Sequence, residues 1–200
     1  MIVLGIDPGT ATTGYGVVAT DTAPAAATTV LGRVAKAGHA GPRLIECGVI
    51  RTSPRAPLHE RLRDIHEGVA ELIARHRPDA LAVEDVFYAR NVRTTVVLGH
   101  ARGVILLAGS MAGLAIHEYS PALIKKTVVG TGAATKEQMQ FMVAKLLRLK
   151  HAPEPADAAD GVGCALTCVM VSEGPTARMR LSAAVAANGA RRPAPGVRRS

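Results

Sequence analysis

The feature that most constrains this chain is its first nine residues, a short apolar run that ends at a carboxylate. Residues 2–6 are typical of a buried β-strand, and Asp7 follows them directly. Pro8 and Gly9 end the strand there, because proline has no N–H to donate to a sheet and glycine admits turn geometry. The ordinary interpretation of an Asp before Pro-Gly is a turn former, so the meaning of Asp7 depends on the rest of the chain.

Residues 57–85 have the pattern of a helix between two strands. Pro57 opens a segment with apolar residues at helical spacing, Pro78 ends it, and residues 80–83 form a second apolar run that closes at Glu84. Such a helix connects parallel strands, which are covered on both faces. If this strand lies beside the first, Asp7 and Glu84 emerge at the same sheet edge, where open α/β sheets place their sites.

The remaining pattern completes an α/β fold in one domain, residues 1–173. Further strands are expected at 15–20, 44–52 and 116–118. Helices are expected at about 92–112, after Ser120, after the capping pair Thr135 and Gln138, and at 156–172. Residues 21–42 are rich in Ala, Thr and Gly and are interpreted as a loose insertion.

Composition excludes several classes of protein. The chain is 48% hydrophobic and 20% charged, which is typical of a soluble globular protein. We find no apolar run of about 18 residues and no basic region before the first apolar run, so we expect no membrane span and no signal peptide. Three sparse cysteines argue against a disulfide framework and favour the cytoplasm. Cys164 and Cys168 lie among apolar neighbours and are interpreted as core, not as zinc ligands.

The net charge of +8 resides mainly in the C-terminal segment. Residues 174–200 contain six arginines and no acid, with much Pro, Gly and Ala. This composition predicts a basic, disordered tail that adds nonspecific attraction to nucleic acid. The charge of the tail therefore says little about the folded domain.

Two further carboxylates open the last predicted helix. Asp157 and Asp160 are three residues apart and so share one helix face. Acids in a first helical turn have an ordinary explanation in the helix macrodipole, but like charges at this spacing repel unless a cation lies between them. Together with Asp7 and Glu84 they form a set of hard oxygen ligands suited to Mg²⁺ or Mn²⁺.

At this point four ordered motifs resemble a known family, the RuvC-type Holliday-junction resolvases. The resemblance covers about residues 1–172 and implies an RNase H-like fold with a five-stranded mixed sheet flanked by helices. It also implies a homodimer that cleaves four-way DNA junctions with divalent metal and works with the RuvA and RuvB branch-migration proteins. The motifs are Gly5-Ile6-Asp7-Pro8-Gly9-Thr10 with Thr13-Gly14-Tyr15-Gly16, Ala82-Val83-Glu84-Asp85-Val86-Phe87, Lys126-Thr127-Val128-Val129-Gly130, and Ala156-Asp157-Ala158-Ala159-Asp160.

The resemblance also assigns roles to individual residues. Asp7, Glu84, Asp157 and Asp160 match the catalytic, metal-binding quartet of the family. Phe87 matches an aromatic residue that contacts junction bases, and Lys125 and Lys136 match lysines that contact DNA. Arg90, Arg93, Arg102 and Lys126 are expected near the same edge, although a solvated surface is the ordinary interpretation of each. Two departures stand out: the insertion at 21–42, and Gly161 with Gly163, which soften the start of the last helix.

Phosphodiester cleavage agrees with this set of residues. Two metal ions roughly 4 Å apart activate a water and neutralise the leaving oxygen, and Asp7 is the expected shared ligand. Two strands of a junction must be cut, which favours a symmetric dimer. The predicted helix at 92–112 is the candidate interface, because Gly99 and Gly103 permit close helix approach beside the apolar run 104–107. The alternative is that this helix is simply buried against the sheet.

Two rival functions fit parts of the sequence. The Gly5–Thr10 segment also resembles the first phosphate loop of actin-like ATPases and sugar kinases, but these need a second domain with a second Asp-x-Gly loop. A nonenzymatic junction-binding protein is the other rival, although it would have little use for four acids on a surface that faces DNA. The sequence therefore predicts a metal-dependent nuclease.

Overall fold

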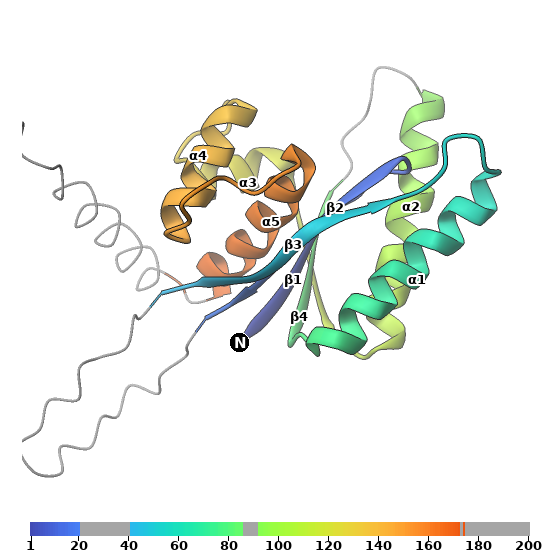
Figure 1. The fold of residues 1–200 in the computed structure, drawn as a ribbon, viewed down its shortest axis with the longest axis horizontal. Helices are drawn as coiled ribbons and strands as arrows, with labels where there is room; N and C mark the ends of the chain where they lie inside the picture. Colours follow the sequence, from blue (N-terminus) through green and yellow to red (C-terminus); the bar gives the residue numbers. More distant parts are fainter. Residues whose placement is uncertain (21–40, 86–91, 173, 175–200) are drawn as a thin grey trace, which may run out of the picture.

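A computed structural model of the chain describes residues 1–20, 41–85, 92–172 and 174. Figure 1 shows one sheet with α1 and α2 on one face and α3, α4 and α5 on the other. Most of the expected insertion at 21–42 and nearly all of the expected tail at 174–200 lie outside the described residues. The elements are β1 (Ile2–Asp7), β2 (Thr12–Ala19), β3 (Arg43–Arg51), α1 (Leu58–His76), β4 (Ala80–Glu84), α2 (Val92–Met111), β5 (Ala115–Tyr119), α3 (Pro121–Val128), α4 (Lys136–Leu146) and α5 (Ala156–Ser172).

The sheet has five strands in the order β3-β2-β1-β4-β5. β1 and β2 pair antiparallel, as do β2 and β3, whereas β4 is parallel to both β1 and β5. The mixed sheet and the parallel placement of β4 beside β1 are therefore confirmed. β2 begins earlier than the predicted 15–20, because the antiparallel pairing continues as far as Asp7 opposite Gly14.

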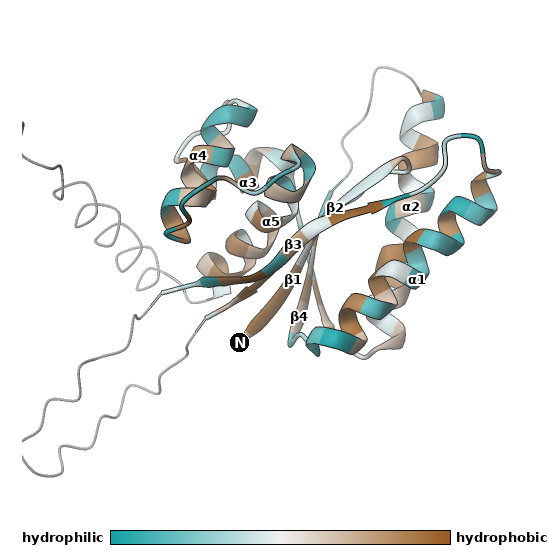
Figure 2. Ribbon diagram, in the orientation of Figure 1, coloured by the Kyte–Doolittle hydropathy of each residue, from teal (hydrophilic) through white to brown (hydrophobic). Residues whose placement is uncertain are grey.

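The sheet separates two hydrophobic cores, because successive side chains of a strand point to opposite faces. Leu4 and Ile6 of β1 pack into the core beneath α1 and α2. Val3 packs into the other core, which is built largely by α5. Figure 2 shows this arrangement as hydrophobic colouring along β1 and hydrophilic colouring on much of α1. The central strands are thus buried on both sides, and only their ends are open to a ligand.

The predicted helix starts are present as local structure. The side chain of Ser120 accepts a hydrogen bond from the N–H of Leu123 and caps α3, where Pro121 takes the first position. Thr135 and Gln138 form the predicted capping box of α4. Both caps lie on the face of the sheet that carries α5, so they fix the helices that surround the end of β1.

α5 is buried almost throughout, from Ala158 to Met170, and it packs on the sheet through glycines. A Cβ atom added to Gly161 would lie 2.6 Å from Cα of Tyr15, and one added to Gly14 would lie 1.9 Å from the carbonyl oxygen of Asp157. Neither distance is possible for a real side chain. The expectation that Gly161 and Gly163 soften the helix therefore needs correction: the helix is intact, and Gly161 is required for backbone contact with β2.

α2 is more apolar overall than the absence of an uninterrupted apolar run of about 18 residues suggests. By length and composition alone, Val92–Met111 is long and apolar enough to cross a membrane, and 22% of its most apolar 18-residue stretch is buried. Its buried residues face the sheet and α1, including Ala101 and Ile105. Gly, His and Arg residues interrupt its apolar run, but they leave its mean hydropathy high. Much of the apolar surface of α2 is therefore exposed in the single chain.

The glycine packing of α5 gives a direct test of this fold. Gly161→Ala is expected to lower the free energy of unfolding by about 3 kcal/mol, because the methyl group must push α5 away from β2. Gly99→Ala is the control, since a Cβ there meets nothing within 4 Å and alanine favours a helix by about 0.5–1 kcal/mol. Urea unfolding of both variants measures the difference, and equal stability of the two would contradict the described packing.

Candidate metal centre

Two strand ends and one helix start bring the four predicted carboxylates to one edge of the sheet. β1 and β4 pair in parallel with Ile6 opposite Val83, so the next residue of each strand, Asp7 and Glu84, lies at the same edge of the sheet. α5 begins above this edge and carries Asp157 and Asp160 in its first two turns. The strands end here for the reason that the sequence indicates, since Pro8 and Gly9 cannot continue β1.

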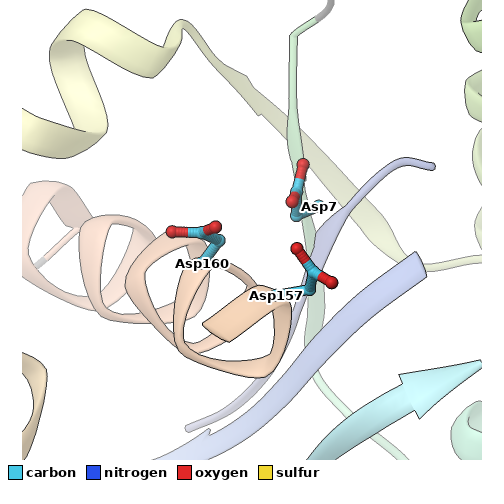
Figure 3. A group of neighbouring side chains, drawn as sticks. All are labelled: Asp7, Asp157 and Asp160. Carbon is cyan, nitrogen blue, oxygen red and sulfur yellow. The ribbon is translucent and has the colours of Figure 1, made fainter. Parts of the chain in front are cut away.

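Three of the four carboxylates form a tight group. Each of Asp7, Asp157 and Asp160 has a carboxylate oxygen within 4.8 Å of one from both others, and Figure 3 shows Asp157 and Asp160 on α5 with Asp7 beside them. Glu84 lies beside them and lines a hollow of about 260 Å³ together with Asp7 and Asp160. We call this the site hollow; its other lining residues are Pro121, Ile124, Lys125, Lys136 and Met139.

The electrostatics of this group disfavour charge. Burial, followed by the negative charges of Asp160 and Asp157, raises the pKa of Asp7 from 3.8 to about 7. Burial, followed by the charges of Asp7 and Asp160, raises the pKa of Glu84 from 4.5 to about 8. The pKa of Asp160 is raised as well, mainly by burial. Several carboxylates that resist ionisation in one place are characteristic of functional sites.

Two lysines partly compensate for the acidic charge. The Lys136 ammonium lies 3.6 Å from an oxygen of Asp160 and 3.9 Å from one of Asp157. The positive charge of Lys136 opposes the rise in the pKa values of Asp7, Glu84 and Asp160, so these values rise less than they would without it. The charge of Lys125 has the same effect on Glu84 and Asp160. Both lysines line the site hollow, so the structure brings together these two predicted DNA-contacting residues and the acids. The sequence did not indicate that Lys136 pairs directly with Asp160.

The other predicted DNA-contacting residues lie elsewhere or are not described. Phe87 and Arg90 fall outside the described residues. Arg93 is exposed in the first turn of α2, and Lys126 is exposed on α3; neither lines the site hollow.

Arg102, which was expected near this edge, has acidic partners of its own. Its guanidinium pairs with Glu118 of β5 and lies 3.4 Å from an oxygen of Asp85, the residue after Glu84. The N–H of Asp85 also donates to the carbonyl oxygen of Tyr119 at 2.8 Å. These contacts hold the end of β4 against α2 and β5, while Glu84 lines the site hollow. In the sequence, only the acidic residue directly after Glu84 indicated these contacts. The partners of Asp85 could not be inferred without the order of the strands.

The donor set fits a hard divalent cation. Asp7, Asp157 and Asp160 supply only carboxylate oxygens, the ligands that Mg²⁺ and Mn²⁺ prefer, and Glu84 can extend the set. Without a cation, three or four ionised groups at this spacing would repel one another strongly at neutral pH. The raised pKa values of Asp7 and Glu84 are the signature of that repulsion together with burial.

Comparison of the sequence with known proteins gives matches over most of its length. Residues 3–168 match the family model described as crossover junction endodeoxyribonuclease RuvC. A protein of that name from Pelotomaculum thermopropionicum is 42% identical over 168 residues, which cover 83% of this chain and 91% of the relative. One from Chloroflexus aurantiacus is 43% identical over 166 residues, with the same coverage.

Solved structures give a consistent result. The RuvC structure from Thermus thermophilus has a TM-score of 0.72 at 37% identity and covers 86% of this chain and 96% of its own. A second Thermus thermophilus RuvC structure, in complex with a Holliday junction substrate, has a TM-score of 0.72 at 34% identity, with coverages of 88% and 98%. The yeast mitochondrial Holliday junction resolvase has a TM-score of 0.54 at 14% identity, a likeness of fold alone.

A five-stranded mixed sheet with acids at the end of its central strands, together with these neighbours, defines an RNase H-like fold. The chain belongs to the RuvC family of crossover junction endodeoxyribonucleases.

The raised pKa values predict how metal-free stability depends on pH. Asp7 and Glu84 bind protons more tightly in the folded protein than in the unfolded chain. This contribution to stability is therefore complete below about pH 4 and is lost as the pH rises through about 7 to 8. In EDTA we expect Asp7→Asn to be more stable than the wild type by about 2 kcal/mol at pH 8, and by much less at pH 4.

Urea unfolding at both pH values, with and without Mg²⁺, measures this effect. Mg²⁺ should raise the stability of the wild type at pH 8 and should stabilise Asp7→Asn much less. Glu67→Gln on the exposed face of α1 is the matched control, because it removes a carboxylate outside the site hollow. A wild-type advantage over Asp7→Asn in EDTA at pH 8 would contradict the electrostatic account.

Proposed function

We propose that this protein is a divalent-metal-dependent endonuclease that resolves four-way DNA junctions by paired, symmetric incisions. The observation that carries the proposal is the gathering of Asp7, Asp157 and Asp160 beside Glu84 at the open edge of the sheet, in a chain of the RuvC family. A relative of known structure is complexed with a Holliday junction substrate, which supports the same substrate class here. Work beside the RuvA and RuvB branch-migration proteins in the cytoplasm belongs to this proposal.

The four carboxylates are the proposed metal ligands, with Asp7 placed centrally between Glu84 and the pair on α5. If bound there, two Mg²⁺ ions, for which Mn²⁺ is the expected substitute, would supply an activated water and neutralise charge on the leaving oxygen of the phosphodiester. Because strand ends and a buried helix hold the carboxylates, little reorganisation is needed when a phosphate enters. Lys136 and Lys125 line the site hollow, so both can receive a phosphate of the scissile strand.

Phe87 is proposed as the aromatic that stacks on a junction base, since it follows Glu84 by three residues. Arg90, Arg93 and Lys126 are proposed as further phosphate contacts. These assignments rest on the sequence and on family membership.

Cleavage of a labelled synthetic four-way junction tests the function. Wild-type protein with Mg²⁺ should cut the junction and should leave a linear duplex of the same sequence largely intact, and EDTA should stop the cutting. Asp7→Asn should lower the cleavage rate by at least about a thousandfold, because it removes a negative ligand. Its junction binding should be equal or tighter in a gel-shift assay, since one charge that repels phosphates is removed.

Glu67→Gln is again the control and should cut as the wild type does. Wild-type protein that binds the junction but does not cut it in Mg²⁺ or Mn²⁺ would overturn the nuclease in favour of a binding protein. A folded Asp7→Asn protein that no longer binds would count against a metal-ligand role for Asp7.

A homodimer formed through α2 is the second part of the proposal. Val92, Val96, Leu107 and Met111 are 77%, 52%, 53% and 73% exposed in the single chain. Together with Gly99 and Gly103 they recur every three or four residues and so share one side of the helix. Such an exposed apolar stripe favours a partner surface, and a second copy of the chain supplies a self-complementary one.

Gly103→Arg tests this interface without disturbing the fold of the protomer. A Cβ at Gly103 meets nothing within 4 Å, so the substitution should leave the protomer stable. It should yield a monomer in light scattering and reduce the fraction of junctions cut on both strands within one binding event. Ala70→Arg on the exposed side of α1 is the matched control. A wild-type protein that is monomeric both free and on junction DNA would contradict the proposal.

A further inference from the structure

A second hollow lies away from the metal centre, at the C-terminal end of α4. It has a volume of about 360 Å³, and no acidic side chain lines it in the described part of the chain. We call it the basic hollow. Its lining residues are Phe141, Ala144, Lys145, Arg148, Leu149, Lys150 and Ala152.

The aromatic residue in the basic hollow is placed unusually for a folded domain. Phe141 is one of two phenylalanines in the chain, yet its side chain is 59% exposed. Its helix turns Met139 and Val143 into the core, and Phe141 points away from that side. The Lys145 ammonium lies 5.4 Å from the centre of the ring, within cation–π range. Burial in the protomer therefore does not explain an aromatic residue at this position.

Three cations surround the same space. Lys145, Arg148 and Lys150 are all exposed, and they lie within six residues of one another. The helix macrodipole explains one or two cations at the end of α4, but it explains neither Lys150 beyond the helix nor the exposed ring. Three cations that share one hollow without a lining acid repel one another unless an anion lies among them.

The position of the basic hollow relative to the metal centre suggests which anion this is. α4 begins at Lys136, which contacts Asp160, and Lys145 lies nine residues later on the same helix. At about 1.5 Å of rise and 3.6 residues per turn, the two lysines are roughly 14 Å apart along the helix axis and project from opposite sides of the helix. The two ammonium groups are therefore separated by at least the length of about four base pairs of duplex, at about 3.4 Å per base pair.

We infer that the basic hollow is a second DNA-binding site, which takes the sugar–phosphate backbone of a duplex arm a few base pairs from the cleaved phosphodiester. The inference rests on the proposed function, because it needs DNA at the metal centre. The three cations bind successive phosphates, and Phe141 packs against the deoxyribose between them. The interaction is independent of base sequence and adds affinity for the arm without entering the chemical step.

Charge removal at the basic hollow tests the inference. The combined variant Lys145→Gln, Arg148→Gln and Lys150→Gln should bind a four-way junction at least about tenfold more weakly in Mg²⁺-free buffer. The slope of log affinity against log salt should fall by about one for each phosphate that the variant no longer neutralises. At saturating protein its single-turnover cleavage rate should stay within about twofold of the wild type. Phe141→Gln should weaken binding about threefold with the salt slope unchanged.

Arg43→Gln, Arg63→Gln and Arg77→Gln together form the matched control, because they remove three exposed cations that line neither hollow. If the control and the hollow variant show the same drop in affinity, only net charge is at work and the inference fails. Thermal unfolding of both variants verifies that α4 is intact.

Uncharged methylphosphonate linkages locate the binding site on the DNA. Placed three to eight base pairs from the crossover, they should weaken wild-type binding but add little to the defect of the hollow variant. Placed at the arm ends, they should have no effect on either protein. If the loss of affinity from the inner methylphosphonates adds in full to that of the hollow variant, the inference is wrong. A wild-type protein that binds the junction but never cleaves it would overturn the proposed function instead.

Discussion

The contact on which the rest of the structure depends is the one between the backbone of α5 and the backbones of β1 and β2. Gly14 and Gly161 remove the side chains that would otherwise hold the helix away from the sheet. Only at this distance can carboxylates on a helix reach the carboxylate at the end of a strand. The carboxylate cluster is therefore a consequence of close backbone packing, and the acids alone would not make it.

The close packing of α5 against the sheet also brings like charges together, which is electrostatically unfavourable. It holds Asp7, Asp157 and Asp160 close together and partly buried, where negative charge is unfavourable, and the raised pKa values of Asp7 and Glu84 reflect this environment. Lys136 offsets part of this negative charge from the start of α4. The hydrophobic cores on both faces of the sheet supply the free energy that keeps the carboxylates in place. A cation held among these carboxylates would relieve the remaining repulsion.

Much of this arrangement could be predicted from the sequence, because local rules govern it. Proline and glycine end β1 after Asp7, a helix between strands makes β4 parallel, and a spacing of three puts Asp157 and Asp160 on one side of α5. The partners of long side chains could not be predicted in this way. Lys136 pairs with Asp160, and Arg102 pairs with Glu118, only because the topology brings separate elements together. The apolarity of α2 was underestimated for a different reason, since interrupting residues conceal a high mean hydropathy.

The burial of α5 has a mechanical consequence. A helix enclosed along twelve residues cannot shift its first turns without opening the core, so the spacing between its carboxylates and the strand ends is nearly fixed. Because the carboxylates cannot move, a DNA substrate has to bend to bring its backbone to them. Discrimination between DNA forms then depends on how much elastic energy each form needs to bring its backbone to the carboxylates. A branched molecule, whose arms can change direction at the crossover, needs less than a continuous stiff duplex.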